Sequence, residues 1–379
     1  MNNVVKQMTS FIVMDVLEKA NEMSINGVDD IIHLEVGEPD FNMPKCAYDS
    51  VLQAMKAGFT HYTHSLGMEE LRTKLSRFYK AEYGVDVEPD RFVITNGSSP
   101  AILIAMMILA GNGSDVIISN PGYSCYRNFI LSCGANPVEF PLSAAEGYQF
   151  DVERLKKVIT PNTAAIVINS PMNPTGTLLE PSVMREMAAL GVPIISDEIY
   201  HGLVYGSAKA HSILEFTDDA FVVNGFSKRY AMTGLRVGYL IAPKRYMRDI
   251  QTIQQNLFIC ASSISQQAAV SVLSGAADAE VDSMRKTYDE RRVYLLDRLQ
   301  SMVFDIKTEP KGAFYVFADA SRFTSDCYKF AFDILEKCHV GITPGIDFGS
   351  RGERFVRFSY ANSIENIKTA MDRLQSTLC

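Results

Sequence analysis

Short apolar segments of strand length alternate with helical segments through the middle of the chain, and this order constrains the fold more than any other feature. Strands that are joined through helices run parallel, because each crossover returns the chain to the same end of the sheet. The order therefore predicts an α/β fold with a mainly parallel sheet and helices on both of its faces. The predicted strands are residues 92–95, 116–119, 164–169, 192–196 and 221–224.

Each predicted strand is followed by a loop that carries polar or aromatic groups. Ligands of open α/β sheets bind outside the carboxyl ends of the strands, so these loops are candidates for one shared site. Loops are polar in general, however, and the pattern is also that of ordinary connections. The candidate groups are Gly97, Ser98, Ser99, Tyr123, Asn173, Asp197 and Lys228.

Lys228 lies just after the predicted strand 221–224, and Arg236 follows eight residues later, before a second apolar run at 237–241. A lysine that is partly desolvated, or close to other cations, has a nucleophilic amine that can bond covalently to a carbonyl group. Arg236 could bind an anion next to that amine. The alternatives are a solvated surface lysine and a surface ion pair of the arginine.

Ser98 and Ser99 precede Pro100, which is a sequence typical of a helix start. Free backbone N–H groups and the helix dipole make such a start a phosphate-binding position, although an ordinary capped helix has the same sequence. Asp197 follows a buried strand, where an ionised carboxylate needs a partner such as a protonated ring nitrogen; a helix N-cap is the alternative. Arg357 lies within an apolar strand, which suggests either a bound anion or a structural ion pair.

Two further residues have equally open interpretations. Tyr123 could stack on a flat ring or pack in the core. Asn173, in the segment NPTG, could be a turn residue alone. Taken jointly, an amine, a phosphate cradle, a carboxylate for a ring nitrogen, a stacking ring and a carboxylate-binding arginine describe pyridoxal 5'-phosphate together with an amino acid.

Composition narrows the possible partners. The chain has 379 residues and a net charge of −8, without a basic stripe, which argues against nucleic acid. Its seven cysteines contain no C-x-x-C pair, and His61 and His64 have no third ligand nearby, so neither a disulfide framework nor a metal site is expected. The longest apolar run, 101–110, is too short to span a membrane. The N-terminus lacks the charge-then-apolar order of a signal peptide, because Asp15 interrupts its apolar stretch. We expect a cytoplasmic protein.

Six motifs, taken in order, resemble those of the aspartate aminotransferase family, the class I and II pyridoxal-phosphate aminotransferases. They read VGEPDF, YTHSLGMEELR, NSPMNPTG, SDEIY, NGFSKRYAMTGLRVGY and FVRFSYA, and the similarity extends over residues 31–378. The resemblance implies fold type I and a homodimer with shared active sites. It also implies an N-terminal arm at 1–40, a large cofactor-binding domain at 41–280 and a small domain at 281–379.

The resemblance also assigns roles to individual residues. Lys228 would carry the cofactor and then move the substrate's Cα proton, and Asp197 would keep the ring nitrogen protonated. Asn173 and Tyr200 would hydrogen-bond the phenolic oxygen, and Tyr123 would stack on the ring. The phosphate would be bound by Gly97, Ser98, Ser99, Ser227 and Arg236, with Tyr62 of the neighbouring subunit, and the substrate carboxylate by Gly37, Asn173 and Arg357.

The chain departs from the family pattern at Gly225, where many members have a phosphate-binding serine, so the contact of Ser227 is an open expectation. The expected activity is transfer of an amino group from an L-amino acid to a 2-oxo acid by a ping-pong mechanism. A carbon–sulfur β-lyase on the same fold and a non-enzymatic regulator are the alternatives. No cation for a second substrate carboxylate is evident; Arg127 and Arg229 are candidates, whereas the apolar segment 11–13 would suit a neutral side chain.

Overall fold

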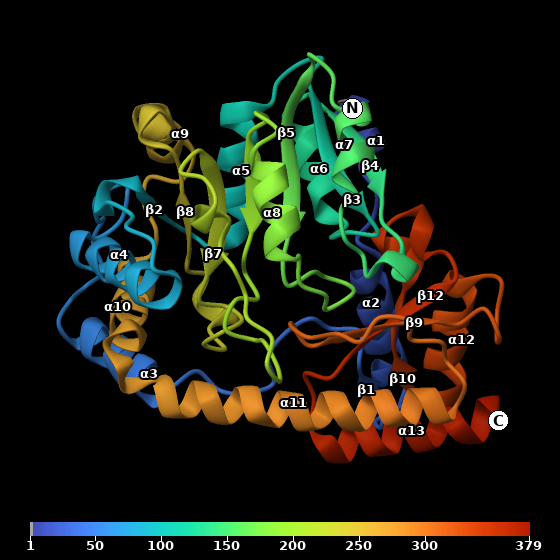
Figure 1. Ribbon diagram of the computed structural model, residues 1–379. Helices are drawn as coiled ribbons and strands as arrows, with labels where there is room; N and C mark the ends of the chain where they lie inside the picture. Colours follow the sequence, from blue (N-terminus) through green and yellow to red (C-terminus); the bar gives the residue numbers. More distant parts are fainter. Residues whose placement is uncertain (1–2) are drawn as a thin grey trace.

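A seven-stranded sheet forms the centre of the computed structural model, which describes residues 3–379 (Figure 1). Its strand order is β2-β8-β7-β6-β5-β3-β4, and all the strands are parallel except β8, which is antiparallel to both of its neighbours. The predicted α/β fold is therefore confirmed. The strands are β2 (Phe92–Thr95), β3 (Asp115–Asn120), β4 (Asn136–Pro141), β5 (Thr163–Asn169), β6 (Ile194–Asp197), β7 (Ala220–Gly225) and β8 (Gly238–Ile241).

Helices cover both faces of this sheet, as the continuous apolar character of its strands requires. Along β5, Ile166 and Ile168 belong to one buried cluster, whereas Ala165 and Val167 belong to another on the opposite face. The first cluster includes side chains of α3 (Lys45–Lys56), α4 (Glu69–Tyr83), α7 (Val152–Val158), α8 (Pro181–Ala188) and α10 (Ser263–Ser271). The second includes side chains of α5 (Ser98–Leu109), α6 (Cys125–Ser132) and α9 (Met247–Leu257).

A third buried cluster joins the two ends of the chain. Ile32 and Leu34 pack with side chains of the C-terminal segment, and the long helix α11 (Asp278–Ser301) runs beneath both parts of the molecule (Figure 1). The small sheets are β1 (Ile32–His33) with β10 (Val340–Gly341), and β11 (Thr343–Pro344) with β12 (Phe355–Ser359) and β9 (Tyr315–Asp319). The remaining helices are α1 (Asn3–Gln7), α2 (Ile12–Ile25), α12 (Cys327–Cys338) and α13 (Ile364–Leu378).

The apolar run at residues 31–36 forms only a short strand, β1. Only Ile32 and His33 pair with β10, because the carbonyl of Glu35 turns toward the Arg357 and Thr343 side chains and accepts their hydrogen bonds instead. This departure from strand pairing brings the N-terminal segment to the site. The domain limits at residues 40 and 280 stay a prediction, and residues 1 and 2 of the predicted arm lie outside the described residues.

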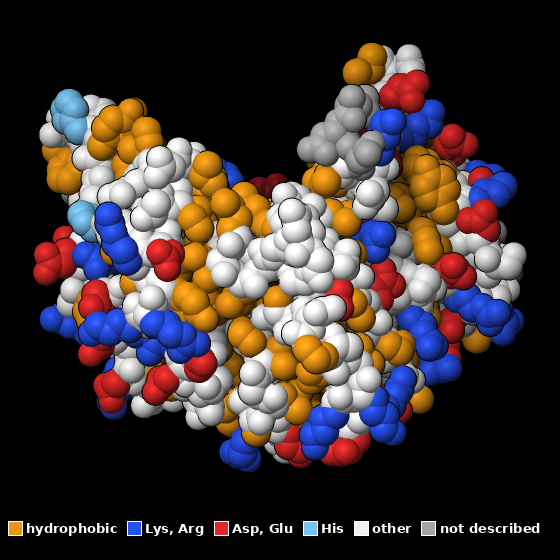
Figure 2. Space-filling model, turned by 90° about the horizontal axis from the view of Figure 1, so that it is seen from above, with side chains coloured by type: hydrophobic (Ala, Val, Ile, Leu, Met, Phe, Trp, Pro, Cys, Tyr) orange, Lys and Arg blue, Asp and Glu red, His pale blue; other side chains and the backbone are white. Residues whose placement is uncertain are grey.

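The surface charges, the helices and the metal-binding side chains were each considered for further binding partners. Basic and acidic side chains are interspersed on the face shown in Figure 2. Within residues 3–379, no helix is long and apolar enough to cross a membrane, and no group of three or more metal-binding side chains is found.

Candidate active site

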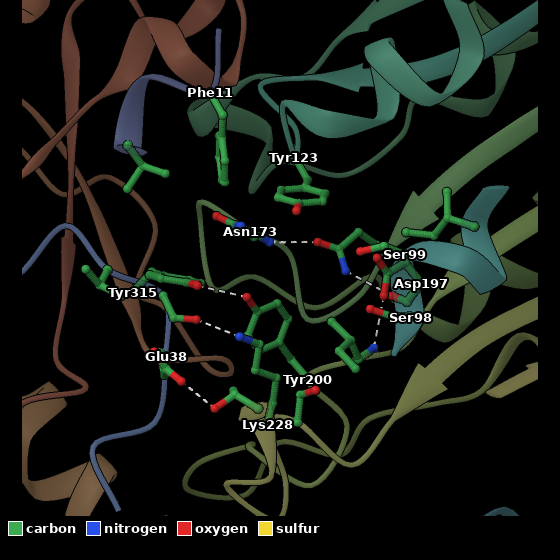
Figure 3. Close-up of a pocket in the computed structure, with 18 of the residues that line it drawn as sticks. Phe11, Glu38, Ser98, Ser99, Tyr123, Asn173, Asp197, Tyr200, Lys228 and Tyr315 are labelled. Carbon is green, nitrogen blue, oxygen red and sulfur yellow. Dashed lines mark hydrogen bonds between the residues drawn. The ribbon is translucent and has the colours of Figure 1, made fainter. Parts of the chain in front are cut away.

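One cavity of about 430 Å³ lies at the carboxyl edge of the central sheet, between that sheet and the part built from the two chain ends (Figure 3). The segments that line it are far apart in the sequence. They include loops that follow the strands, which we expected to lie together at this edge. The predicted site residues that line it are Gly37, Ser98, Ser99, Tyr123, Asn173, Asp197, Tyr200, Ser227, Lys228, Arg236 and Arg357.

Lys228 reaches the cavity from the turn after β7, and its Nζ donates a hydrogen bond to the Gly37 carbonyl at 2.6 Å. Burial lowers the pKa of this amine to about 8; the nearby charges of Arg357 and Arg236 also lower it, whereas Glu38 and Asp197 oppose the shift. A lysine with this pKa is uncharged in an appreciable fraction of molecules near neutral pH. Lys228 therefore has the protonation balance that a nucleophile and proton carrier needs.

Asp197 ends β6 and is 4% exposed. The Tyr126 hydroxyl donates to its Oδ2 at 2.6 Å, and the Ile199 amide donates to Oδ1 at 3.1 Å. Burial raises the pKa of Asp197 to about 6, although both hydrogen bonds and the charge of Lys228 lower it. The carboxylate is thus fixed in position but lacks a cationic hydrogen-bond partner, which a protonated ring nitrogen would provide.

The N-terminus of α5 and Arg236 form one anion-binding end of the cavity. Ser98 and Ser99 are the first residues of α5, where backbone N–H groups have no partner within the helix. Gly97 does not line the cavity; it has a φ of 89°, and a Cβ there would overlap the Arg236 guanidinium. Arg236 itself has a φ of 49°, and its Nη1 is held by the Thr233 carbonyl at 2.9 Å. This rare backbone conformation sets the arginine against the helix N-terminus.

Arg357 forms a second anion-binding group and is 2% exposed. Its Nη1 donates to Asn173 Oδ1 at 2.9 Å, and its Nη2 donates to the Glu35 carbonyl at 2.5 Å. The guanidinium lies 4.2 Å from the centre of the Tyr315 ring, and Nε has no hydrogen-bond partner among the described residues. No acidic side chain in residues 3–379 is within ion-pair distance of Arg357, so this buried charge favours a bound anion over the structural ion pair considered from the sequence.

The cavity also contains polar side chains that the sequence analysis did not identify. The Tyr315 and Tyr200 hydroxyls are 2.8 Å apart, and Asn169 Oδ1 accepts the Asn173 amide at 2.8 Å (Figure 3). Tyr126 bonds Asp197 as described above. Asn169 is the first residue of the motif NSPMNPTG, so the sequence contained a signal for this site residue. Tyr126 and Tyr315 lie in apolar segments that are typical of the core and gave no such signal.

The N-terminal arm forms an apolar wall of the cavity. The Phe11 ring makes an edge contact with the Tyr123 ring, with centroids 6.1 Å apart (Figure 3). Val13, Met14 and Leu17 of α2 line the same wall. These side chains make this part of the cavity lining apolar.

The two cations considered for a second substrate carboxylate do not line this cavity. Arg127 pairs with Glu139 at 3.6 Å, and Arg229 is directed toward Phe78 and Glu82 on the other side of its turn. Neither candidate is therefore placed to bind a second substrate carboxylate, because both side chains point away from the site. Tyr62 is 80% exposed and does not reach the cavity of its own chain, so its contact with a neighbouring subunit stays a prediction.

Comparison with known proteins identifies what this chain resembles. Residues 29–374 match the family model of aminotransferase class I and II. The chain is 43% identical to (5-formylfuran-3-yl)methyl phosphate transaminase of Methanocaldococcus jannaschii, over 97% of each chain. It is 38% identical to valine–pyruvate aminotransferase of Mycobacterium tuberculosis, over 97% of this chain and 96% of that one. Aspartate aminotransferase from Thermus thermophilus, solved with maleate, superposes with a TM-score of 0.95 at 32% identity and covers 100% of this chain and 99% of its own.

Proposed function

This chain belongs to the class I and II aminotransferases and is a transaminase, and we propose that it transfers the amino group of a neutral L-amino acid to a 2-oxo acid. The proposed acceptor is 2-oxoglutarate or pyruvate, and the two substrates react in turn at one site. The observation that carries this proposal is the set of cations around the cavity: among residues 3–379 of this chain, those that line it include Lys228, Arg236 and Arg357 and no other lysine or arginine. Each of the three has a function in the proposal, and none is left for a side-chain carboxylate.

The residues around the cavity fit pyridoxal 5'-phosphate. Arg236 and the α5 N-terminus, with Ser98, Ser99 and in our proposal Ser227, would bind the phosphate. Asp197 would hold the ring nitrogen, since burial leaves this carboxylate in need of a positive partner. Asn173 and Tyr200 would bind the phenolic oxygen, and Tyr123 would stack on the ring. The buried carboxylate and the buried, unpaired Arg357 are costly in an empty protein, and binding of this cofactor and its substrate would offset both costs.

When bound, pyridoxal phosphate withdraws electrons from the substrate Cα, so that loss of the Cα proton becomes feasible. Arg357 and the Gly37 backbone would orient the substrate carboxylate, with Asn173 held in place by Arg357. Lys228, whose pKa of about 8 allows both protonation states, would accept the Cα proton and return it at the neighbouring carbon. Asp197 would keep the proton on the ring nitrogen during both half-reactions.

The apolar wall determines the proposed donor. A carboxylate at the far end of the substrate would face Phe11, Val13 and Met14, and an unpaired buried charge is unfavourable. The valine–pyruvate activity in the name of one relative agrees with a neutral donor. The (5-formylfuran-3-yl)methyl phosphate in the name of another carries a furan ring and a phosphate, so relatives differ in what lies beyond the reacting carbon.

We also propose a cytoplasmic homodimer with shared active sites. Exposed apolar side chains gather on α3 and the loop after it, where Tyr48 is 53% exposed and Met55 57%. Tyr62 lies on the same loop, and burial of this surface by a second copy would bring its hydroxyl to the phosphate of the partner.

The test of this function is a donor comparison. We expect alanine, valine, leucine and phenylalanine to react with 2-oxoglutarate or pyruvate within about a hundredfold of aspartate in kcat/KM, or better than aspartate, which is the range that apolar bulk alone can impose. Arg127→Ala is the matched control and should leave the order of donors unchanged, since its partner is Glu139. A preference for aspartate far above a hundredfold would refute the neutral donor. Formation of pyruvate from cysteine without any acceptor would favour the lyase.

A further inference from the structure

The first turn of the arm helix α2 is capped by a residue that is distant in the sequence. Phe11 stands at the N-cap position and offers no side-chain acceptor, so the first N–H groups of the helix need another partner. Asp347 provides it: its Oδ1 accepts the Ile12 amide at 2.9 Å. The two residues are 335 positions apart, which makes this contact a property of the folded chain alone.

Asp347 is buried in a segment that contacts the site. It is 6% exposed and lies in the short 3-10 helix η7 (Gly345–Phe348), and its Oδ2 has no hydrogen-bond partner among the described residues. The next residue, Phe348, packs against the Arg357 guanidinium, 4.9 Å from the ring centre, and its carbonyl accepts the Gly122 amide at 2.9 Å. The segment that caps the arm thus also contacts the arginine of the site and the loop that carries Tyr123.

The surroundings of Asp347 shift the pKa of its carboxyl group in opposite directions. Burial raises the pKa of this carboxyl to about 6; the Ile12 amide and the Arg357 charge lower it, and the Asp15 charge raises it. Burial raises the pKa of the thiol of Cys125, the first residue of α6, and the charge of Asp347 raises it further. When Asp347 is ionised, the N-terminus of α2 is the partner that its buried carboxylate needs, because helix N-termini stabilise negative charge.

The rest of the arm is attached differently. The later turns of α2 pack Val16 and Ala20 against Leu335 of α12. The segment before α2 is held by a pair of exposed hydrogen bonds between Thr9 and Asn128. Loss of the Asp347 contact would therefore loosen the first turn, with Phe11 and the start of the apolar wall, and leave the later turns of the helix in place.

We propose that Asp347 is a positioning residue: it fixes the first turn of α2 over the cavity and so sets the selectivity for apolar substrate side chains. The preference among donors rests on the proposed function, whereas the fixing of the helix does not depend on it. Leucine and phenylalanine extend to the wall and depend on its position, and alanine is too short to reach it.

The test compares Asp347→Ala and Asp347→Asn with Asp326→Ala. Asp326 also caps a helix with its carboxylate, as the N-cap residue of α12 that accepts the Lys329 amide at 2.9 Å, but it lies away from the cavity. Hydrogen–deuterium exchange of the backbone amides at residues 11–16 should become about 5- to 30-fold faster in Asp347→Ala, which is the range expected for loss of a helix cap. Asp347→Asn keeps an oxygen acceptor and should restore part of the protection. Asp326→Ala should leave exchange in this segment unchanged.

Steady-state kinetics on the holoenzyme test the selectivity. In Asp347→Ala, kcat/KM for leucine and phenylalanine should fall several-fold relative to alanine, through KM and with kcat nearly constant. Unchanged exchange at residues 11–16 would overturn the positioning role. Faster exchange with an unaltered ratio of leucine to alanine would overturn the selectivity. If the unmodified enzyme transaminates no amino acid, the proposed function fails, and the exchange measurement still decides whether Asp347 fixes the helix.

Discussion

Replacement of Asp197 by Asn should make the cofactor-free protein more stable near neutral pH and the loaded enzyme much less active. The carboxylate is buried, and the two hydrogen bonds from Tyr126 and Ile199 do not offset its desolvation, since its pKa rises from 3.8 to about 6. Asn has nearly the same shape and carries no charge; its oxygen can accept the Ile199 amide, and its NH2 group can donate to the Tyr126 hydroxyl oxygen. The variant therefore separates the effect of the charge from the effect of the packing.

The size of the stability effect follows from the pKa. A shift of about two units corresponds to about 3 kcal/mol, because each unit is worth about 1.4 kcal/mol. A raised carboxyl pKa means that the folded state favours the protonated acid. The cost of the charge is thus absent below about pH 4, grows between about pH 4 and 6, and is complete above about pH 6. The stability of Asp197→Asn relative to the unmodified protein should rise over this window by up to about 3 kcal/mol.

Thermal unfolding of both cofactor-free proteins at about pH 4.5, 6 and 7.5 measures this difference. Asp86→Asn is the control, because Asp86 lies in a surface ion pair with Lys80 and is 81% exposed. With the cofactor, Asp197→Asn should lose turnover on the order of 10²-fold or more, since the ring nitrogen loses its charged partner. A stability difference that does not change with pH would refute the desolvation argument. A near-native kcat would refute the role in holding the ring proton.

Two further predictions concern the covalent link and the subunit contact. Borohydride reduction of the loaded enzyme followed by peptide mapping should place the pyridoxyl group on Lys228, the lysine with the lowered pKa in the cavity, and its recovery on another lysine would contradict the assignment. Mixing Lys228→Ala chains with Tyr62→Ala chains should give hybrid dimers in which one site has both defects and the other has neither, so activity should exceed that of either parent; a fully active monomer would exclude shared sites.

The parallel sheet and the loops at its carboxyl edge could be predicted because both depend on local patterns. An apolar run of four to six residues followed by polar residues identifies a buried strand and its end, whatever the rest of the chain does. The direction of β8 could not be predicted, because Gly238–Ile241 is as apolar as the parallel strands. Tyr315 was missed for a related reason: it alternates with core residues of β9, and only the three-dimensional fold sets its hydroxyl beside Tyr200 and its ring under Arg357.

The selectivity for the amino donor could not be predicted from the sequence, and the positions of two arginines show why. Arg127 follows Tyr123 by four residues, a spacing that places side chains on one helix face, but α6 begins only at Cys125, so Tyr123 precedes the helix and the rule does not apply. Arg229 is adjacent to Lys228, yet its stem passes over Gly202, where a Cβ would lie 2.6 Å from its Cδ, and leads away from the cavity. In our proposal the distal end of the substrate would face the arm, whose first helical turn contacts Asp347, 335 positions away in the sequence. The apolar lining at this end of the cavity therefore depends on contacts between segments that are distant in the sequence. The proposed amino donor follows from the folded structure and could not be inferred from the sequence.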